Sequence, residues 1–192
     1  MHLYSRLVLA SICCVMAWAG TAGAIGSGEK SPEDKAGEAS RKATSAYNDA
    51  VHNIDRAREV TKKGDSTYAY NYRATSDAKA RREYEKAIAS LQEAIKLNPQ
   101  FKEAYNNLGY CDRKLGKLTE SLAAYDKAIA LDSNFAQARE YRGETYLALD
   151  QLRKAESELD FLVSIKSHYA DQLKNSIELY KLAEIDKAAH GK

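Results

Sequence analysis

Residue types that could do chemistry are sparse in this sequence. Three histidines follow the N-terminal segment, at His52, His168 and His190, and none has a second His, Cys or carboxylate at metal-ligand spacing. We therefore interpret them as surface histidines. The sequence predicts no metal site and no cofactor.

One cysteine outside the N-terminal segment, Cys111, is the remaining candidate nucleophile. It falls on the same helical face as Leu108, where a free cysteine more often packs as a small apolar side chain. The chain has no glycine-rich phosphate loop, no Gly-x-Ser-x-Gly turn and no paired-cysteine motif. These observations predict a protein without enzymatic activity.

The composition indicates helices almost throughout. The 192 residues are 44% hydrophobic and 29% charged, with only two prolines and ten glycines, and Ala, Leu, Lys and Glu are frequent. The formal net charge is only +2, which gives no basic surface of the kind that binds nucleic acid or anionic lipid. We predict an all-α protein.

The N-terminal segment over residues 1–24 has a different character. A start that carries Arg6 precedes an apolar run over residues 7–19, and the small residues Ala22 and Ala24 follow. The run is shorter than the about 20 residues that span a bilayer. Residues 1–24 are therefore interpreted as a secretory signal peptide cleaved after Ala24, which would give a periplasmic or extracellular protein with no membrane span in the mature chain.

Two alternatives to this leader are weaker. One is an uncleaved membrane anchor, and the other is a lipoprotein signal, in which a small residue rather than Ile12 would precede Cys13. Cleavage would remove Arg6 and leave 28 basic residues against 27 acidic ones.

Residues 25–37 are rich in Gly, Ser, Pro and charge, so we expect a flexible linker there. In residues 38–63, apolar residues recur at gaps of four and three, and Lys62, Lys63 and Gly64 supply a helix stop. This pattern predicts an amphipathic helix at the start of a helical domain over residues 38–189.

The remaining sequence repeats itself at a constant period. Three windows align, 68–101, 102–135 and 136–169, and each ends on an aromatic residue. In the second half of each window the apolar residues have helical spacing, as at Ala87, Leu91, Ala94 and Ile95. The pattern predicts pairs of packed helices.

Two glycines share this period, since Gly109 and Gly143 stand at the same position of successive windows. A glycine inside a helix is costly unless two helices approach closely there. We therefore expect a close helix contact at both positions.

Residues 103–132 resemble a tetratricopeptide repeat. The residues that match this family's pattern are Leu108, Gly109, Gly116, Tyr125 and Ala128, with Tyr105 in place of the usual Trp. The resemblance implies a right-handed superhelical stack of antiparallel helix pairs, a tetratricopeptide-like α-solenoid, with a capping helix over residues 170–189. We expect that helix to bury Leu173, Ile177 and Tyr180 and to present a polar outer face.

The first window departs from the family pattern in its first half. Either this half is a degenerate repeat helix, or the helix over 38–63 takes its place and residues 66–82 are an insertion. Because residues 69–97 contain no Gly or Pro, we favour one long helix that includes the insertion. In the last window, Arg139 and Arg142 occupy the places of Tyr105 and Leu108, which suggests a looser stack.

The resemblance to tetratricopeptide proteins implies a curved trough, which is formed by the first helices of the repeats. Projecting the matched positions onto this trough gives the candidate partner-binding residues Tyr72, Ser76, Lys79, Glu103, Asn106, Tyr110, Arg113, Gln137, Glu140 and Glu144. Tyr110 and Arg113 lead, because Tyr and Arg are enriched at binding hot spots. The basic residues with which some family members clamp a C-terminal carboxylate are missing.

The expected function is a non-enzymatic scaffold or adaptor in the cell envelope or periplasm that binds a peptide or helix of a partner protein. The alternative is a structural protein that associates with its own copies through the apolar ends of the repeat array.

Overall fold

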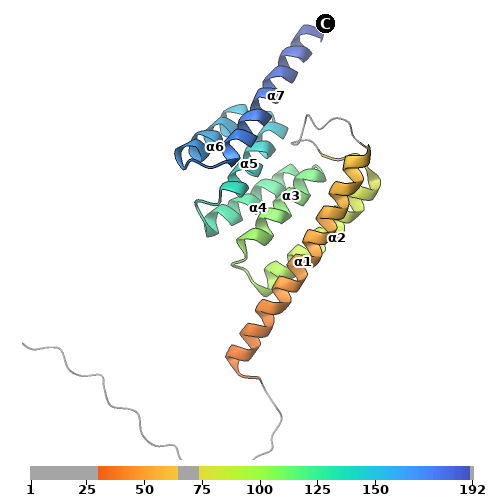
Figure 1. The fold of residues 1–192 in the computed structure, drawn as a ribbon, viewed down its shortest axis with the longest axis vertical. Coiled ribbons are helices and arrows are strands. Elements are labelled where there is room, and N and C mark those ends of the chain that lie inside the picture. Colours follow the sequence, from red (N-terminus) through yellow and green to blue (C-terminus); the bar gives the residue numbers. More distant parts are fainter. Residues whose placement is uncertain (1–29, 65–73, 191–192) are drawn as a thin grey trace, which may run out of the picture.

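The structure of the chain, a computed structural model, describes residues 30–64 and 74–190. Within these residues there are helices and no strands. The helices are α1 (Pro32–Gly64), α2 (Ala78–Leu97), α3 (Lys102–Lys114), α4 (Leu118–Leu131), α5 (Ala136–Ala148), α6 (Leu152–Ser164) and α7 (Tyr169–His190). They stack as antiparallel pairs, α1 with α2, α3 with α4 and α5 with α6, and α7 closes the stack (Figure 1). The predicted all-α, tetratricopeptide-like solenoid with a C-terminal helix is confirmed.

Helix α1 begins at Pro32, inside the stretch expected to be a linker. The hydroxyl of Ser31 accepts a hydrogen bond from the backbone N–H of Asp34 at 3.1 Å and donates one to the Asp34 carboxylate at 2.7 Å. A serine cap followed by proline in the first helical position is a strong start signal. The linker prediction is therefore wrong for residues 32–37, because local capping outweighs their polar composition.

Helix α2 begins at Ala78, much later than the long helix that we favoured. The carboxylate of Asp77 accepts a hydrogen bond from the Ala80 backbone N–H at 2.8 Å and caps the helix. Just before it, the backbone N–H of Thr75 donates to the Lys114 carbonyl at 2.9 Å and ties this segment to the end of α3. One unbroken helix over 69–97 is therefore wrong. Helix α1 packs along α2 as its partner, which agrees with the favoured arrangement, in which the helix over 38–63 takes the place of the first half of the window.

The turns between paired helices repeat with the sequence period. Gly116 and Asp150 stand at equivalent positions of successive windows, and both have positive φ angles, of 81° and 56°. After each, a backbone N–H donates to the carbonyl five residues earlier at 2.8 Å, which closes the helix end. A positive φ angle is less favourable for an aspartate than for a glycine. The side chain of Asp150 is held by the Tyr180 hydroxyl, which donates a hydrogen bond to its carboxylate at 3.1 Å.

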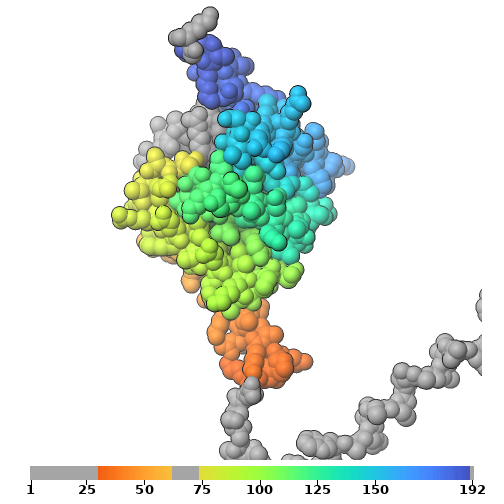
Figure 2. All heavy atoms as spheres, turned by 180° about the vertical axis from the view of Figure 1, so that it is seen from behind, coloured from red at the N-terminus to blue at the C-terminus, as the bar shows by residue number. Residues whose placement is uncertain are grey.

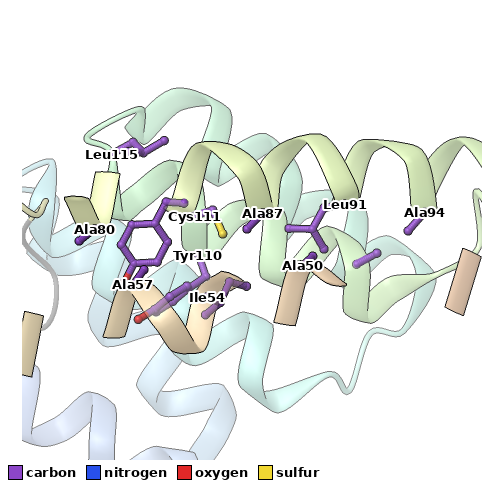
Figure 3. Close-up of a cluster of buried hydrophobic side chains, with 12 residues drawn as sticks. Ala50, Ile54, Ala57, Ala80, Ala87, Leu91, Ala94, Tyr110, Cys111 and Leu115 are labelled. Carbon is purple, nitrogen blue, oxygen red and sulfur yellow. The ribbon is translucent and has the colours of Figure 1, made fainter. Parts of the chain in front are cut away.

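Small residues let the first helix pair pack closely. Ala50 and Ala57 of α1 lie in the same buried cluster as Ala87 and Ala94 of α2, and all four are fully buried (Figure 3). Leu91 lies between them, and burying a leucine stabilises a fold by roughly 1.5–3 kcal/mol. Ala87, Leu91 and Ala94, which the repeat pattern places on one helix face, are thus core residues, as predicted.

The two glycines that share the repeat period mark close helix contacts, although with different neighbours. A Cβ atom on Gly109 would lie 2.7 Å from Cε1 of Tyr125 in α4, the partner helix of α3. One on Gly143 of α5 would lie 2.6 Å from Cδ2 of Leu173 in α7. Close approach is confirmed at both positions, and at the second it fixes where the terminal helix docks.

We expect Gly109→Ala to lower the free energy of unfolding by about 1–3 kcal/mol, because the new methyl group would overpack the fully buried Tyr125 ring. The matched control is Gly37→Ala in α1, where the nearest neighbouring atom would be 3.7 Å away on the Arg41 side chain. That change should stabilise the helix by about 0.5–1 kcal/mol. Urea unfolding followed by circular dichroism measures both, and equal effects of the two substitutions would contradict the assigned contact.

Candidate functional site

The residues that first suggested chemistry lie apart from one another. His52 is exposed on α1, His168 is exposed in the turn before α7, and His190 is exposed at the end of α7. Cys111 is fully buried in the core formed by α1, α2 and α3. Burial raises the pKa of its thiol, which disfavours the thiolate that a nucleophile needs. In the part of the chain that the structure describes, no His, Cys, Asp or Glu cluster could hold a metal ion.

The predicted trough residues differ in how far they are exposed to solvent. Tyr72 lies outside the described residues. Ser76 and Lys79 are exposed, Glu103 and Gln137 are half-buried, and Lys79 lines a cleft of about 490 Å³ between α1 and α2. The other five are interior, with exposed fractions of 7% or less: Asn106, Tyr110, Arg113, Glu140 and Glu144. The structure therefore differs from the expected open trough, because these five side chains pack against one another and against neighbouring helices.

Buried and half-buried side chains form a polar seam, by which we mean Arg58, Tyr110, Arg113, Tyr141, Glu144 and Ser176. It starts at α1, where Nε of Arg58 donates to the Tyr110 hydroxyl of α3 at 3.2 Å. The Tyr110 and Tyr141 rings, whose centroids are 5.4 Å apart, link α3 to α5. At the far end, the hydroxyl of Ser176 in α7 donates to Oε1 of Glu144 at 3.0 Å. The seam thus joins the first helices of three successive pairs to the terminal helix.

An ion pair lies at the centre of the polar seam. Nη2 of Arg113 is 2.7 Å from Oε2 of Glu144, and the side chains are only 1% and 2% exposed. Burial disfavours the charge on Arg113, but the Glu144 carboxylate, together with Tyr125, Tyr110 and Glu140, outweighs it and holds the pKa of the guanidinium above its usual value. The guanidinium also lies 5.5 Å from the Tyr110 ring centroid and 5.6 Å from that of Tyr141. A buried charge needs such partners, since an isolated one would be too costly to desolvate.

Glu140 lies one helical turn before Glu144 and is 2% exposed. Burial and the nearby Glu144 raise the pKa of Glu140 to about 9, against the opposing influence of Arg113. Its Oε2 atom has no hydrogen-bond partner. A carboxyl group in this setting is neutral at neutral pH.

The sequence analysis missed a second charged contact, between α5 and α6. Arg139 and Arg142 do stand at normally apolar positions, but both bind Glu158: Nη1 of Arg139 lies 3.1 Å from Oε2, and Nε of Arg142 lies 2.9 Å from Oε1. The Arg139 guanidinium also lies 3.5 Å from the centroid of the Phe161 ring. The two arginines therefore connect the last pair by charge, where we had expected looser packing. Glu158 lies on the second helix of the same repeat window, and this acidic residue was the signal in the sequence that the two arginines have a partner there.

The exposed side of α7 carries a row of apolar side chains among its polar ones, where a polar face was expected. Leu173, Ile177 and Tyr180 are buried, as predicted. Beside them runs a second row, the α7 stripe, which consists of Leu179, Leu182 and Ile185 with exposed fractions of 36%, 62% and 66%. The C-terminal end of α7 extends beyond the other helices (Figures 1 and 2). The expectation of a polar outer face is wrong for this end of the helix.

Comparison with known proteins supports the repeat assignment. Residues 72–134 and 112–162 match the profile of the tetratricopeptide repeat, which together is a little under half of the chain. No curated protein matches the sequence.

Similar solved structures include a tetratricopeptide domain of Arabidopsis OM64, with a TM-score of 0.47 and 20% sequence identity over 66% of this chain and 97% of that one. Another is the first tetratricopeptide domain of Spaghetti (RPAP3), solved with the HSP90 peptide SRMEEVD. It has a TM-score of 0.49 and 16% identity over 72% of this chain and 95% of that one.

The helix pairs form an α-solenoid, and residues 72–162 within it are similar in sequence to the tetratricopeptide repeat. Across residues 30–64 and 74–190, no helix combines the length and the apolar character needed to cross a membrane.

We expect Arg113→Met to lower the free energy of unfolding by about 3–5 kcal/mol, because it leaves a buried carboxylate without its counter-ion. The matched control is Lys181→Met, which removes an ion pair of the same 2.7 Å length to Glu156 between side chains that are 50% and 40% exposed. That surface pair should contribute no more than about 1 kcal/mol. Chemical denaturation of both variants makes the comparison, and similar losses would mean that Arg113 and Glu144 are not buried together.

Proposed function

We propose that this chain is an exported, non-enzymatic scaffold of the cell envelope or periplasm that binds a helix of a partner protein. Export is supported by the leader over residues 1–24, and binding by the tetratricopeptide repeats, whose structural role in known proteins is to present surfaces to other chains.

The α7 stripe is the observation that carries this proposal. Three large apolar side chains spaced three residues apart on one helix face are suited to packing against another helix. The charged neighbours are paired within the chain, Lys181 with Glu156 and Lys174 with Glu178, so the stripe favours an apolar contact over a strongly charged one. The polar seam, in contrast, already uses its side chains to hold the repeats together.

Self-association through the same stripe is the second candidate. A stable interface usually buries about 800 Å² on each partner, and three side chains per copy provide much less than that. A partner whose contacts continue from the stripe onto the charged flanks of α7 therefore suits the observation better than a second copy does.

Site-specific crosslinking tests the binding surface. A photoreactive amino acid in place of Ile185 should capture a partner protein in the native compartment, and Leu182→Asp should abolish that capture because it places a charge in the stripe. The matched control is the same group in place of Val163, which is 58% exposed but lies on α6. Equal capture from both positions would contradict a role for the stripe. An adduct of the chain with itself would favour the second candidate, which light scattering of the purified chain checks independently.

Export makes a separate prediction. When the full-length chain is expressed in its native host, the mature protein should begin at Ile25 and be found outside the cytoplasm. Intact-mass measurement of the protein from fractionated cells reads both properties. A protein that still carries residues 1–24 and is found in the cytoplasmic fraction would contradict export. It would not contradict binding through the α7 stripe.

A further inference from the structure

Around Arg113, the almost completely buried ionisable groups are two acids, Glu140 and Glu144, and a single base. Glu140 and Glu144 are both almost completely buried on consecutive turns of α5, and Arg113 of α3 faces them. Arg113 and Glu144 are the two charged groups that act on Glu140 among the residues that the structure describes. One guanidinium cannot neutralise two buried carboxylates, so one of the two acids must remain uncharged.

Ion pairing and hydrogen bonding identify which acid is neutral. Glu144 has a polar partner near each oxygen, since Oε2 lies 2.7 Å from Nη2 of Arg113 in an ion pair and Oε1 accepts a hydrogen bond from Ser176 at 3.0 Å. Among the described residues Glu140 forms no ion pair within 4.0 Å, and its buried Oε2 has no hydrogen-bond donor. An ionised carboxylate needs donors far more than a carboxylic acid does, because burial removes the water that would otherwise solvate its charge. The geometry therefore assigns the charge to Glu144 and the proton to Glu140.

We propose that the packing of α5 between α3 and α7 is a proton-binding device: Glu140 holds a proton in the folded protein, and loss of that proton loosens the C-terminal half of the array. On loss, the proton passes from the Glu140 carboxyl to the solvent and leaves a second buried negative charge beside Glu144. The groups that would feel this charge are Arg113 of α3, Tyr141 of α5 and Tyr169 at the start of α7. From α1, Arg58 acts on Tyr141.

The direction of the pH effect follows from the raised pKa of Glu140, about 9 in the folded protein against an ordinary 4.5. Folding then takes up a proton at any pH between these two values. The stabilisation is complete below the unfolded pKa and is lost as the pH rises through the folded one. Alkaline conditions therefore destabilise the fold, and lowering the pH below the unfolded pKa adds no further stability through this group.

Thermal unfolding of the full-length chain tests the proposal, with Glu140→Gln as the principal variant. Glutamine has the shape of the neutral acid and cannot ionise. The melting temperature of the unaltered chain should fall by at least about 4 °C relative to Glu140→Gln between about pH 6 and about pH 9. The exposed-site control Glu93→Gln on α2 should follow the unaltered chain. A Glu140→Gln variant that loses stability in parallel with the unaltered chain, or that fails to fold near neutral pH, would overturn the proposal.

Two further measurements separate a proton site from a merely structural side chain. In Glu144→Gln, Arg113 becomes available to Glu140, so the alkaline loss of stability should disappear. Hydrogen exchange, corrected for the intrinsic effect of pH, should show α5 and α7 losing protection at about pH 9 while α1 and α2 keep theirs. A uniform loss over all helices, or an alkaline loss that persists in Glu144→Gln, would contradict a proton held at the seam.

Discussion

The buried ion pair between Arg113 and Glu144 is the interaction on which the arrangement of the later repeats depends. It joins α3 to α5, the first helices of successive pairs, and through Ser176 it extends to α7. Such a pair tolerates little displacement, because separating the charges would leave each one desolvated without compensation. It therefore fixes the spacing between successive repeats more tightly than apolar contacts, which can slide and repack.

This constraint changes what the repeat architecture offers to a partner. The first helices of the repeats would ordinarily present side chains to a ligand, yet here those side chains reach one another and are buried. Of the large apolar side chains that remain exposed, three lie on α7 at the end of the array, and Val163 and Ile165 lie at the end of α6. A helical-repeat array built in this way packs the side chains of its polar seam between the helices and exposes apolar side chains on its last helix. This arrangement supports placing partner recognition at the α7 stripe.

Much of the fold could be predicted from the sequence, because the repeat period constrains residues that pack. The spacing of Leu91, Tyr125 and their equivalents located the second helix of each pair, and Gly109 marked a close approach. Local capping was the signal overlooked at Ser31 and Asp77, whose side chains set the starts of α1 and α2. The burial of Arg113 and Glu140 could not be predicted in this way. Helical periodicity indicates which face a side chain occupies, but not what lies against that face.

Hydroxyl-radical footprinting of the folded chain tests the central claim most directly, since it reports the solvent accessibility of individual side chains. After correction for intrinsic reactivity, we predict that Tyr110 and Leu147, on the first helices of their pairs, are protected, while Leu182 and Ile185 of the α7 stripe are oxidised rapidly. Oxidation of Tyr110 and Leu147 as fast as Leu182 and Ile185 would contradict the account. It would mean that the first helices line an open groove and that their polar residues are available to a partner.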